Sequence, residues 1–263
     1  MNATELYPDT EQRRRIMDFI MAAGQTLLEN GAEVFRVEQT MEIMARSFHL
    51  REFHVYVLTN GIFASAGTAE ISEVRNVPNR MVHLGRVAAV NELSREIAAG
   101  RCPLDDAERR LAEAQRIPLP GAKAQLACGA VGAFCFALLF GGDLRAGAAA
   151  SLAGLAASAY LLLCARRQLP GGFQKVTTAM LITLICVLLC PLFQANASHA
   201  IIGTLMILTP GIAFTMGIRD FVHGDYLSGT IRMIDAVLIA ASIAIGTGVV
   251  LRLYTMLTGV VVV

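Results

Sequence analysis

The sequence predicts a polytopic α-helical membrane protein, with about five transmembrane helices and an N-terminal α+β cytosolic domain. Apolar residues make up 55% of the 263 residues and charged residues only 16%, which is too apolar for an ordinary soluble protein. The charges are also unevenly placed, because the last 140 residues hold only 7 of the 22 Lys and Arg and 4 of the 21 Asp and Glu. We therefore expect a first part that folds in water and a second part that lipid must solvate.

Residues 1–116 are expected to form the cytosolic domain, and they open with two amphipathic helices. Asp9 or Thr10 is suited to cap the first helix, which should stop at Asn30–Gly31. In both helices, apolar residues recur at spacings of three and four, so each helix presents one stripe to a core. The first stripe is Ile16, Phe19, Ile20, Ala23 and Leu27, and the second is Val34, Val37, Met41, Met44 and Phe48.

The apolar period then changes to two, which indicates strands. Residues 53–59 and 62–66 flank Asn60–Gly61, a dipeptide that readily supplies the two positive φ angles of a tight hairpin. Residues 71–77 provide a possible third strand. Residues 82–99 and 104–115 return to helical patterns, and the Pro-bracketed residues 117–123 are expected to be a linker.

Residues 124–263 form the expected transmembrane bundle, because each of five apolar stretches approaches the roughly 20 residues that cross a bilayer. The first 17 residues are polar and lack the apolar core of a signal peptide, so we expect a cytosolic N-terminus. Basic residues after the second and fourth spans mark cytosolic loops, so the chain should cross the inner membrane several times and end outside the cytosol. The expected spans are 124–140, 146–165, 176–193, 201–218 and 231–255.

Arg252 interrupts the last span, so either one long tilted helix brings Arg252 to the outer headgroups or the tail folds back. The six cysteines include no His or Cys arrangement that would complete a metal site. We expect them all to be small buried hydrophobes, without disulfides, in a reducing compartment. They are Cys102, Cys128, Cys135, Cys164, Cys186 and Cys190.

Two features of the membrane part are relevant to transport. Small residues cover most of the second span, which favours close helix packing more than a solute path. Pro210 and Gly211 lie in the middle of the fourth span, where a break is expected. Such a break is either a structural kink or, as in many transporters, part of a solute site.

The densest polar cluster follows that break. Arg219, Asp220 and Asp225 precede the fifth span, and Arg232 and Asp235 lie three residues apart within it. These charges either anchor helix ends at the cytosolic interface or line a substrate or proton pathway. Asp235 should lie nearly one turn inside the helix, where it is either a proton-coupling group or a carboxylate held ionised by Arg232.

The rest of the sequence gives no catalytic site. Glu33, Arg36 and Glu38 form a charged face on the second helix, which solvation alone would explain. No nucleophile elbow, phosphate-binding loop or metal-ligand pattern is present in the sequence, so neither an enzyme nor a cofactor is expected. The net charge of +1 gives no reason to expect nucleic-acid binding.

Two segments resemble the signatures of the threonine/serine exporter family. Residues 31–38 (GAEVFRVE) resemble the signature of its N-terminal domain. Pro210–Gly211, residues 218–220 (IRD) and residues 224–229 (GDYLSG), followed by Arg232, resemble its membrane signature. The chain departs from the family at Met216, where Asn is frequent, and at Asp235, where Glu is frequent. The resemblance covers essentially the whole chain.

This resemblance implies export of threonine and serine driven by the proton-motive force. Full-length members carry a second membrane module, so the chain resembles a split form whose second module is a separate small polytopic protein. The resemblance also implies an oligomeric complex. Such pairs also resemble succinate exporters, which leaves a dicarboxylate as the alternative solute. An alternative of another class is a membrane-anchored regulatory scaffold, although an anchor needs one span and not five. A membrane-embedded enzyme is the third possibility.

Overall fold

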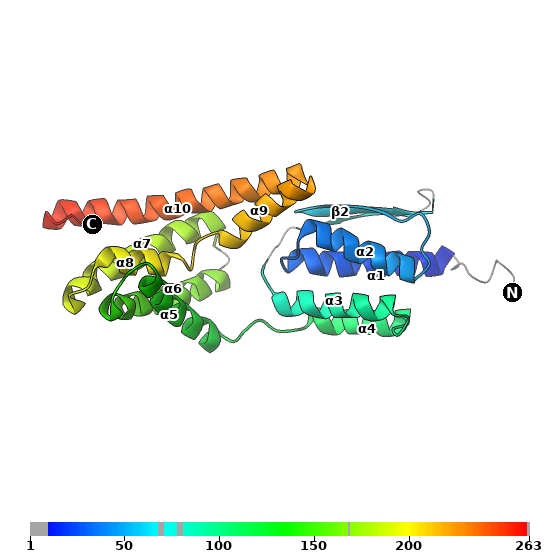
Figure 1. The fold of residues 1–263 in the computed structure, drawn as a ribbon, viewed down its shortest axis with the longest axis horizontal. Helices are drawn as coiled ribbons and strands as arrows, with labels where there is room; N and C mark the ends of the chain where they lie inside the picture. The colour runs from blue at the N-terminus through cyan, green and yellow to red at the C-terminus, as the bar shows by residue number, and fades with distance from the viewer. Residues whose placement is uncertain (1–9, 68–70, 78–80, 168, 262–263) are drawn as a thin grey trace. The chain divides into compact units, whose positions relative to one another are not determined.

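A computed structural model describes residues 10–67, 71–77, 81–167 and 169–261, and 73% of these residues are helical (Figure 1). Contacts divide the chain into two compact units. The first unit comprises Met1–Leu119 and Thr215–Arg232, and the second comprises Pro120–Phe214 and Met233–Val263. Asp9, one of the two expected caps of the first helix, lies outside the described residues.

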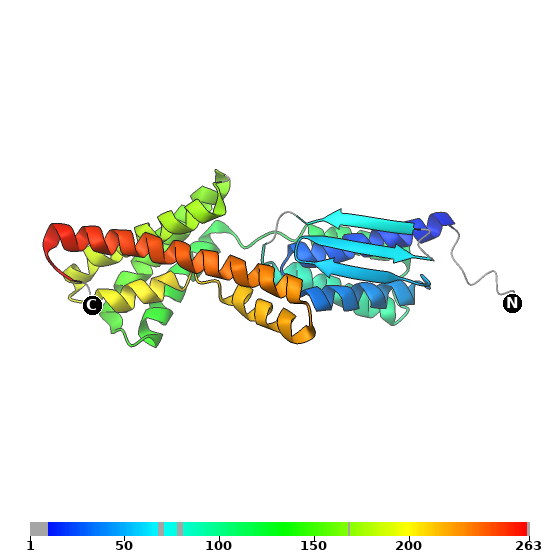
Figure 2. The ribbon, with the colours of Figure 1, turned by 90° about the horizontal axis from the view of Figure 1, so that it is seen from above.

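The first unit contains four N-terminal helices and one antiparallel sheet of three strands in the order β1-β2-β3. The sheet lies on α1 and α2, and α3 and α4 lie on the other side of those two helices (Figures 1 and 2). The elements are α1 (Thr10–Glu29), α2 (Val34–Ser47), β1 (His54–Leu58), β2 (Gly61–Ala66), β3 (Ile71–Asn76), α3 (Leu84–Ala98) and α4 (Leu104–Gln115).

The expected amphipathic helices are confirmed. All five residues of the predicted α1 stripe are at most 3% exposed, and Val34, Val37, Met41 and Met44 of α2 are fully buried. Burying each such side chain contributes about 1.5–3 kcal/mol. One face of the sheet, α3 and α4 complete this core, in which Ile62 of β2 and Leu93 of α3 are almost fully buried.

The hairpin differs from the sequence prediction. Leu58 pairs with Gly61, so the two loop residues are Thr59 and Asn60, and neither Asn60 nor Gly61 has a positive φ angle. The third strand accounts for the difference, because Gly61 also pairs with Asn76 and the Asn60 carbonyl accepts a 2.8 Å hydrogen bond from the Val77 amide. Gly61 therefore pairs with both β1 and β3, and Asn60–Gly61 does not form an isolated tight turn.

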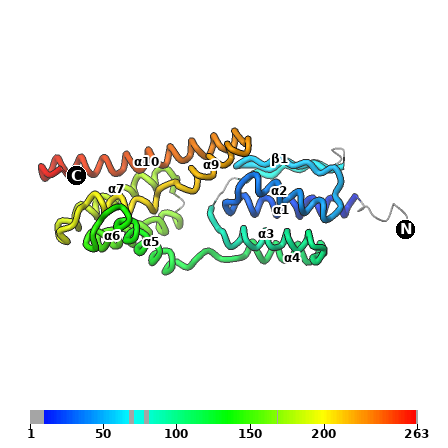
Figure 3. Tube along the Cα trace, in the orientation of Figure 1, coloured from blue at the N-terminus to red at the C-terminus, as the bar shows by residue number. Residues whose placement is uncertain are grey.

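The second unit is built mainly of long helices that the tube view traces in order (Figure 3). Four helices among the described residues are long and apolar enough to cross a membrane, namely α5, α6, α7 and α10. The fourth predicted span is instead divided between two shorter helices, α8 and α9. The bounds are α5 (Ala122–Leu139), α6 (Leu144–Arg166), α7 (Gly171–Phe193), α8 (Ala197–Leu205), α9 (Gly211–His223) and α10 (Tyr226–Thr258).

In the second unit, small side chains fill the interior and large apolar side chains lie outside, which is the reverse of a soluble protein. Its interior is largely alanine, with Ala133, Ala150 and Ala179 fully buried, whereas Leu139 and Leu188 are 74% and 56% exposed. An apolar exterior around a small-residue interior is the arrangement expected of helices packed in lipid. The protein is therefore a polytopic helical membrane protein, and α10 runs unbroken through Arg252, which selects the long-helix alternative over a folded-back tail.

Two of the cysteine expectations are wrong. Cys102, Cys164, Cys186 and Cys190 are buried, but Cys128 and Cys135 are exposed on α5. Helix α5 is apolar all round, so its sequence does not distinguish an inward face from a lipid-facing one. Every one of the six is a free thiol.

The contact between α5 and α6 gives a first testable prediction. A Cβ atom on Gly154 would lie 2.5 Å from the Gly129 carbonyl oxygen and 2.7 Å from Ala133 Cβ, whereas one on Gly132 would meet nothing within 4 Å. Gly154→Ala should therefore destabilise the bundle by about 1–3 kcal/mol through overpacking. Gly132→Ala is the matched control and should be neutral or slightly stabilising. Equal thermal unfolding midpoints of the two variants in detergent would contradict this packing.

Candidate functional site

The corner between α9 and α10 contains four of the five residues of the predicted polar cluster, all except Asp235. Helix α9 ends at His223, Gly224 turns the chain with a φ angle of +89°, and α10 begins at Tyr226. The Asp225 amide donates to the Asp220 carbonyl at 2.9 Å, and the Asp225 carbonyl accepts from Gly229 at the same distance. A Cβ atom on Gly229 would lie 2.7 Å from the Phe221 ring, so glycine permits the close approach of the two helices.

A buried ion pair lies inside this corner. Arg232 Nε is 2.9 Å from Asp220 Oδ2, and the two residues are only 8% and 3% exposed. Arg232 Nη1 also lies 3.6 Å from the sulfur of Met216. Ser228, 1% exposed, adds a buried hydroxyl that has no hydrogen-bond partner among the described residues. Because buried charges are costly unless paired, both partners should be essential to this arrangement.

The other signature segment, residues 31–38, contacts α9. Glu33 at the start of α2 forms an ion pair with Arg219, and the ring of Phe35 stacks on His223 with centroids 4.7 Å apart. His223 Nδ1 lies 2.8 Å from the Arg219 carbonyl oxygen, which fixes the ring along α9. The two segments that carry the sequence resemblance therefore meet within the first unit, although 186 positions separate Glu33 from Arg219.

Glu38 and Arg36 have different surroundings. A Glu38 carboxylate oxygen accepts a 2.8 Å hydrogen bond from the Val57 amide of β1, so this side chain links α2 to the sheet. Burial raises the pKa of Glu38, the Val57 hydrogen bond partly opposes that effect, and the charges of Asp225 and Glu42 raise the pKa further. Arg36 is exposed and donates to Gln39 of its own helix, apart from these contacts.

The raised pKa of Glu38 predicts a dependence of stability on pH. Because the folded state holds this proton more tightly than the unfolded state, the stability of the fold should fall as pH rises from the ordinary value of 4.5 to the raised folded value. Glu38→Gln should remove this part of the pH dependence. Unfolding midpoints measured across that pH window test the prediction, with exposed Glu92→Gln as control. An unchanged pH profile for Glu38→Gln would contradict it.

In the second unit, the expected break at Pro210–Gly211 is present. After α8 ends at Leu205, the Ile207, Leu208 and Thr209 amides donate to carbonyls three residues earlier, at 2.9–3.3 Å. Helix α9 begins at Gly211, and the Pro210 carbonyl accepts from Phe214 at 3.0 Å. Proline and glycine therefore separate two helices within the segment predicted as one span.

Asp235 has a neighbour that the sequence reasoning missed. It is half-buried in α10, and its charge interacts with that of Lys175 near the start of α7. The spacing of Arg232 and Asp235 on one helix indicated their common face, but it gave no sign of Asp220 as an ion-pair partner of Arg232. The Lys175 interaction could have been suspected from the sequence, because a basic residue begins one apolar helix and an acidic residue lies inside another.

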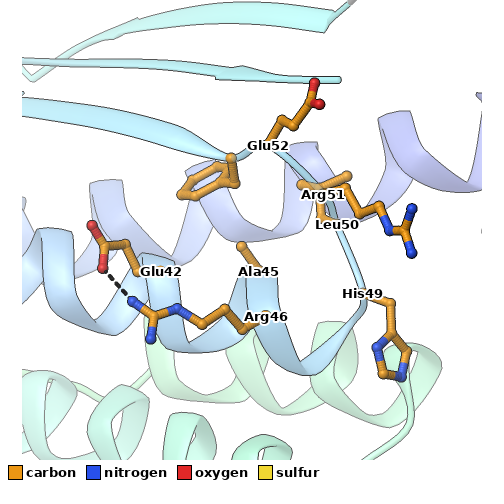
Figure 4. A pocket seen from close by; sticks show the side chains of 8 residues that line it. Glu42, Ala45, Arg46, His49, Leu50, Arg51 and Glu52 are labelled. Atoms are coloured by element: carbon orange, nitrogen blue, oxygen red, sulfur yellow. Dashed lines mark hydrogen bonds and ion pairs between the residues drawn. The ribbon is translucent and has the colours of Figure 1, made fainter. Parts of the chain in front are cut away.

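One cavity contains none of the predicted site residues. It has a volume of about 490 Å³ and lies at the turn from α2 to β1 (Figure 4). Its charged side chains include Glu42 and Arg46, which form an ion pair at 2.8 Å. His49 and Glu52 in its wall have φ angles of +57° and +51°, so the turn itself is conformationally unusual.

The fold defines a polytopic helical membrane protein, with a buried ion pair in the first unit and a broken helix in the second. The family model described as threonine/serine exporter matches residues 18–254. The chain therefore belongs to the threonine/serine exporter family, whose named activity is transport and not chemical conversion.

Two curated relatives agree with this assignment. The "Probable threonine/serine exporter" of Mycobacterium tuberculosis is 24% identical over 249 residues, which cover 93% of this chain and 47% of the relative. The "Threonine/serine exporter" of Corynebacterium glutamicum is 22% identical over 261 residues, which cover 93% of this chain and 52% of the relative. The chain thus spans about half the length of these relatives. No solved structure matches it significantly.

Proposed function

We propose that the chain takes part in the export of threonine and serine across the cell membrane, driven by the proton-motive force. The observation that carries this proposal is the family match over residues 18–254. The buried Asp220–Arg232 pair supports it, because charges buried in protein are costly and strongly perturbed ionisable groups gather at functional sites. The broken helix between α8 and α9 adds backbone groups of the kind that transporters use to bind solutes.

Within this proposal, the helix break and the α9–α10 corner have separate roles. Pro210 and Gly211 open the backbone beside the solute path, and Asp220 with Arg232 holds the α9–α10 corner closed until solute or a proton competes for one of the charges. Asp225 and Asp235 are the further candidates for proton coupling, and Arg219 ties the corner to Glu33. We place the α9–α10 corner in the cytosol because Arg219 and Arg232 flank it, and residues 1–116 with it because Glu33 pairs with Arg219.

We further propose that the complete pathway includes a second membrane module and is oligomeric. The length of the two relatives supports this, since each is about twice the span that this chain matches. The small residues of α6 are buried within this unit, so the docking face lies on its exposed apolar surface instead. Reconstitution decides whether that module belongs to a separate small polytopic protein.

The decisive experiment is transport into proteoliposomes under an imposed proton gradient. Labelled threonine, serine and succinate are compared, with and without the candidate second module. Gradient-dependent movement of threonine and serine is expected, and only in the presence of the module. Movement of succinate alone would indicate a dicarboxylate exporter. Movement of no solute, with the chain folded and the module present, would favour a regulatory scaffold.

Proton coupling is tested separately with Asp235→Asn, which preserves the shape of the side chain and removes its titration. The rate of threonine export by this variant should lose its dependence on external pH. A pH profile identical to that of the unaltered chain would exclude Asp235 as the coupling group.

A further inference from the structure

A polar cavity in the first unit contains none of the residues assigned above to transport. Its volume is about 350 Å³, near the lower end for small-molecule sites. Side chains from α1, β3, α3 and α4 surround it, so four elements of one folded unit build its walls. The polar lining includes Gln25, Glu29, Asn30, Arg75, Arg86 and Gln115.

The cavity presents one negative and one positive charge that no opposite charge neutralises within the described part of the chain. Glu29 accepts a 2.7 Å hydrogen bond from the neutral Gln25 amide. Arg86 donates through Nε and Nη2 to the neutral carbonyl of Ile117, at 3.0 and 2.9 Å. Arg75 differs, because its guanidinium forms ion pairs with both Asp18 and Glu73.

A buried hydrogen-bond acceptor adds an independent observation. Asn30 is 2% exposed, and its Nδ2 donates to the Thr26 carbonyl at 2.7 Å. That bond fixes the orientation of the amide, because only the nitrogen can donate to a carbonyl. The opposite atom, Oδ1, is buried without a hydrogen-bond partner among the described residues. An unpartnered buried acceptor costs free energy that a bound donor would recover.

We propose that this cavity binds a small zwitterionic α-amino acid. Glu29 and Asn30 Oδ1 are acceptors for an ammonium group, and Arg86 is a donor for a carboxylate. Gln115, which donates to the hydroxyl of Thr26 at 2.9 Å, keeps its amide oxygen for a polar side chain of the ligand. The site is separate from the transport residues, so it senses the amino acid and does not carry it.

The charges argue against other ligands of similar size. A dicarboxylate or phosphate would place its second negative charge beside Glu29, and a diamine would place its second positive charge beside Arg86. Each of these would leave one wall charge unpaired and add a repulsion. One charge of each sign on the wall matches one charge of each sign on the ligand.

Binding is tested calorimetrically with the full chain in lipid nanodiscs, where no gradient exists. L-threonine and L-serine are the probes. Three comparison compounds differ in charge: ethanolamine lacks the carboxylate, L-lactate lacks the ammonium group, and succinate carries two negative charges. Titrations are run on the unaltered chain, on Glu29→Gln and Arg86→Gln, and on Glu92→Gln as the control carboxylate, which is exposed on α3. The same set is repeated with Asp220→Asn and Arg232→Gln both present, which removes the buried ion pair of the proposed transport site.

The expected result is binding of the amino acids alone, weakened about tenfold or more by Glu29→Gln or Arg86→Gln, because each loses a charge-assisted hydrogen bond. Glu92→Gln should leave the affinity unchanged, and the binding should persist when the transport site is neutralised. Affinities unaffected by Glu29→Gln and Arg86→Gln would overturn the proposal, as would binding that disappears with the transport-site charges. Transport that fails while this binding persists would refute the proposed function and leave the cavity assignment intact.

Discussion

Asp220→Asn is expected to destabilise the protein by about 3–5 kcal/mol and to abolish export. The substitution leaves the Arg232 guanidinium buried beside a neutral amide, and a buried charge that loses its partner carries the full cost of its desolvation. Thermal unfolding in detergent, followed by the transport assay on the folded fraction, measures the two effects. An unchanged unfolding midpoint would show that the pair is not buried in the protein.

A double variant separates folding from transport. Asp220→Asn combined with Arg232→Gln removes both charges together, so most of the lost stability should return. Export should remain absent if the charges themselves are needed. Restored export in this neutral pair would mean that the ion pair only holds the corner together, and Asp225→Asn offers a comparison at a half-buried carboxylate of the same corner.

Replacing Pro210 and Gly211 together by alanine is expected to reduce export strongly while leaving expression and folding intact. In a helix interior, proline costs about 3 kcal/mol and glycine about 1 kcal/mol relative to alanine. Their removal favours one continuous helix from α8 into α9, which would withdraw the backbone groups between Leu205 and Gly211 from the solute path. Initial rates of threonine export in proteoliposomes provide the measurement.

The control for this variant replaces Gly171 and Gly172 by alanine. These glycines lie at the start of α7, where an added Cβ meets nothing within 4 Å. Export by this control should match the unaltered chain. If the alanine pair at 210–211 exports at the same rate as the control, the break has a structural role only.

Periodicity allowed the sequence to predict the helices of the first unit. The stripe through Ile16, Ile20 and Leu27 repeats within one segment, so it needs no knowledge of the partner surface. The hairpin was harder to predict from the sequence, because the loop at Thr59–Asn60 depends on the pairing of Gly61 with Asn76 in a third strand. Local turn chemistry does not contain that information.

The candidate site was predictable as a set of residues but not as a set of contacts. Composition alone singled out Asp220 and Arg232, because charges are rare in the second half of the sequence. Their contact depends on how the turn at Gly224 returns the chain, and the Glu33–Arg219 pair depends on two segments 186 positions apart. Helical spacing relates residues only within one helix, so neither contact could be found from it.

The length of α10 has a consequence for the surrounding membrane. Its 33 residues extend about 50 Å at about 1.5 Å per residue, whereas the hydrocarbon core of a bilayer is about 30 Å thick. Such a helix must tilt or project beyond the hydrocarbon, and a change in acyl-chain length alters how far it does either. The thickness of the host bilayer is therefore expected to influence this protein, and lipids of different chain length become a physical variable in any reconstitution.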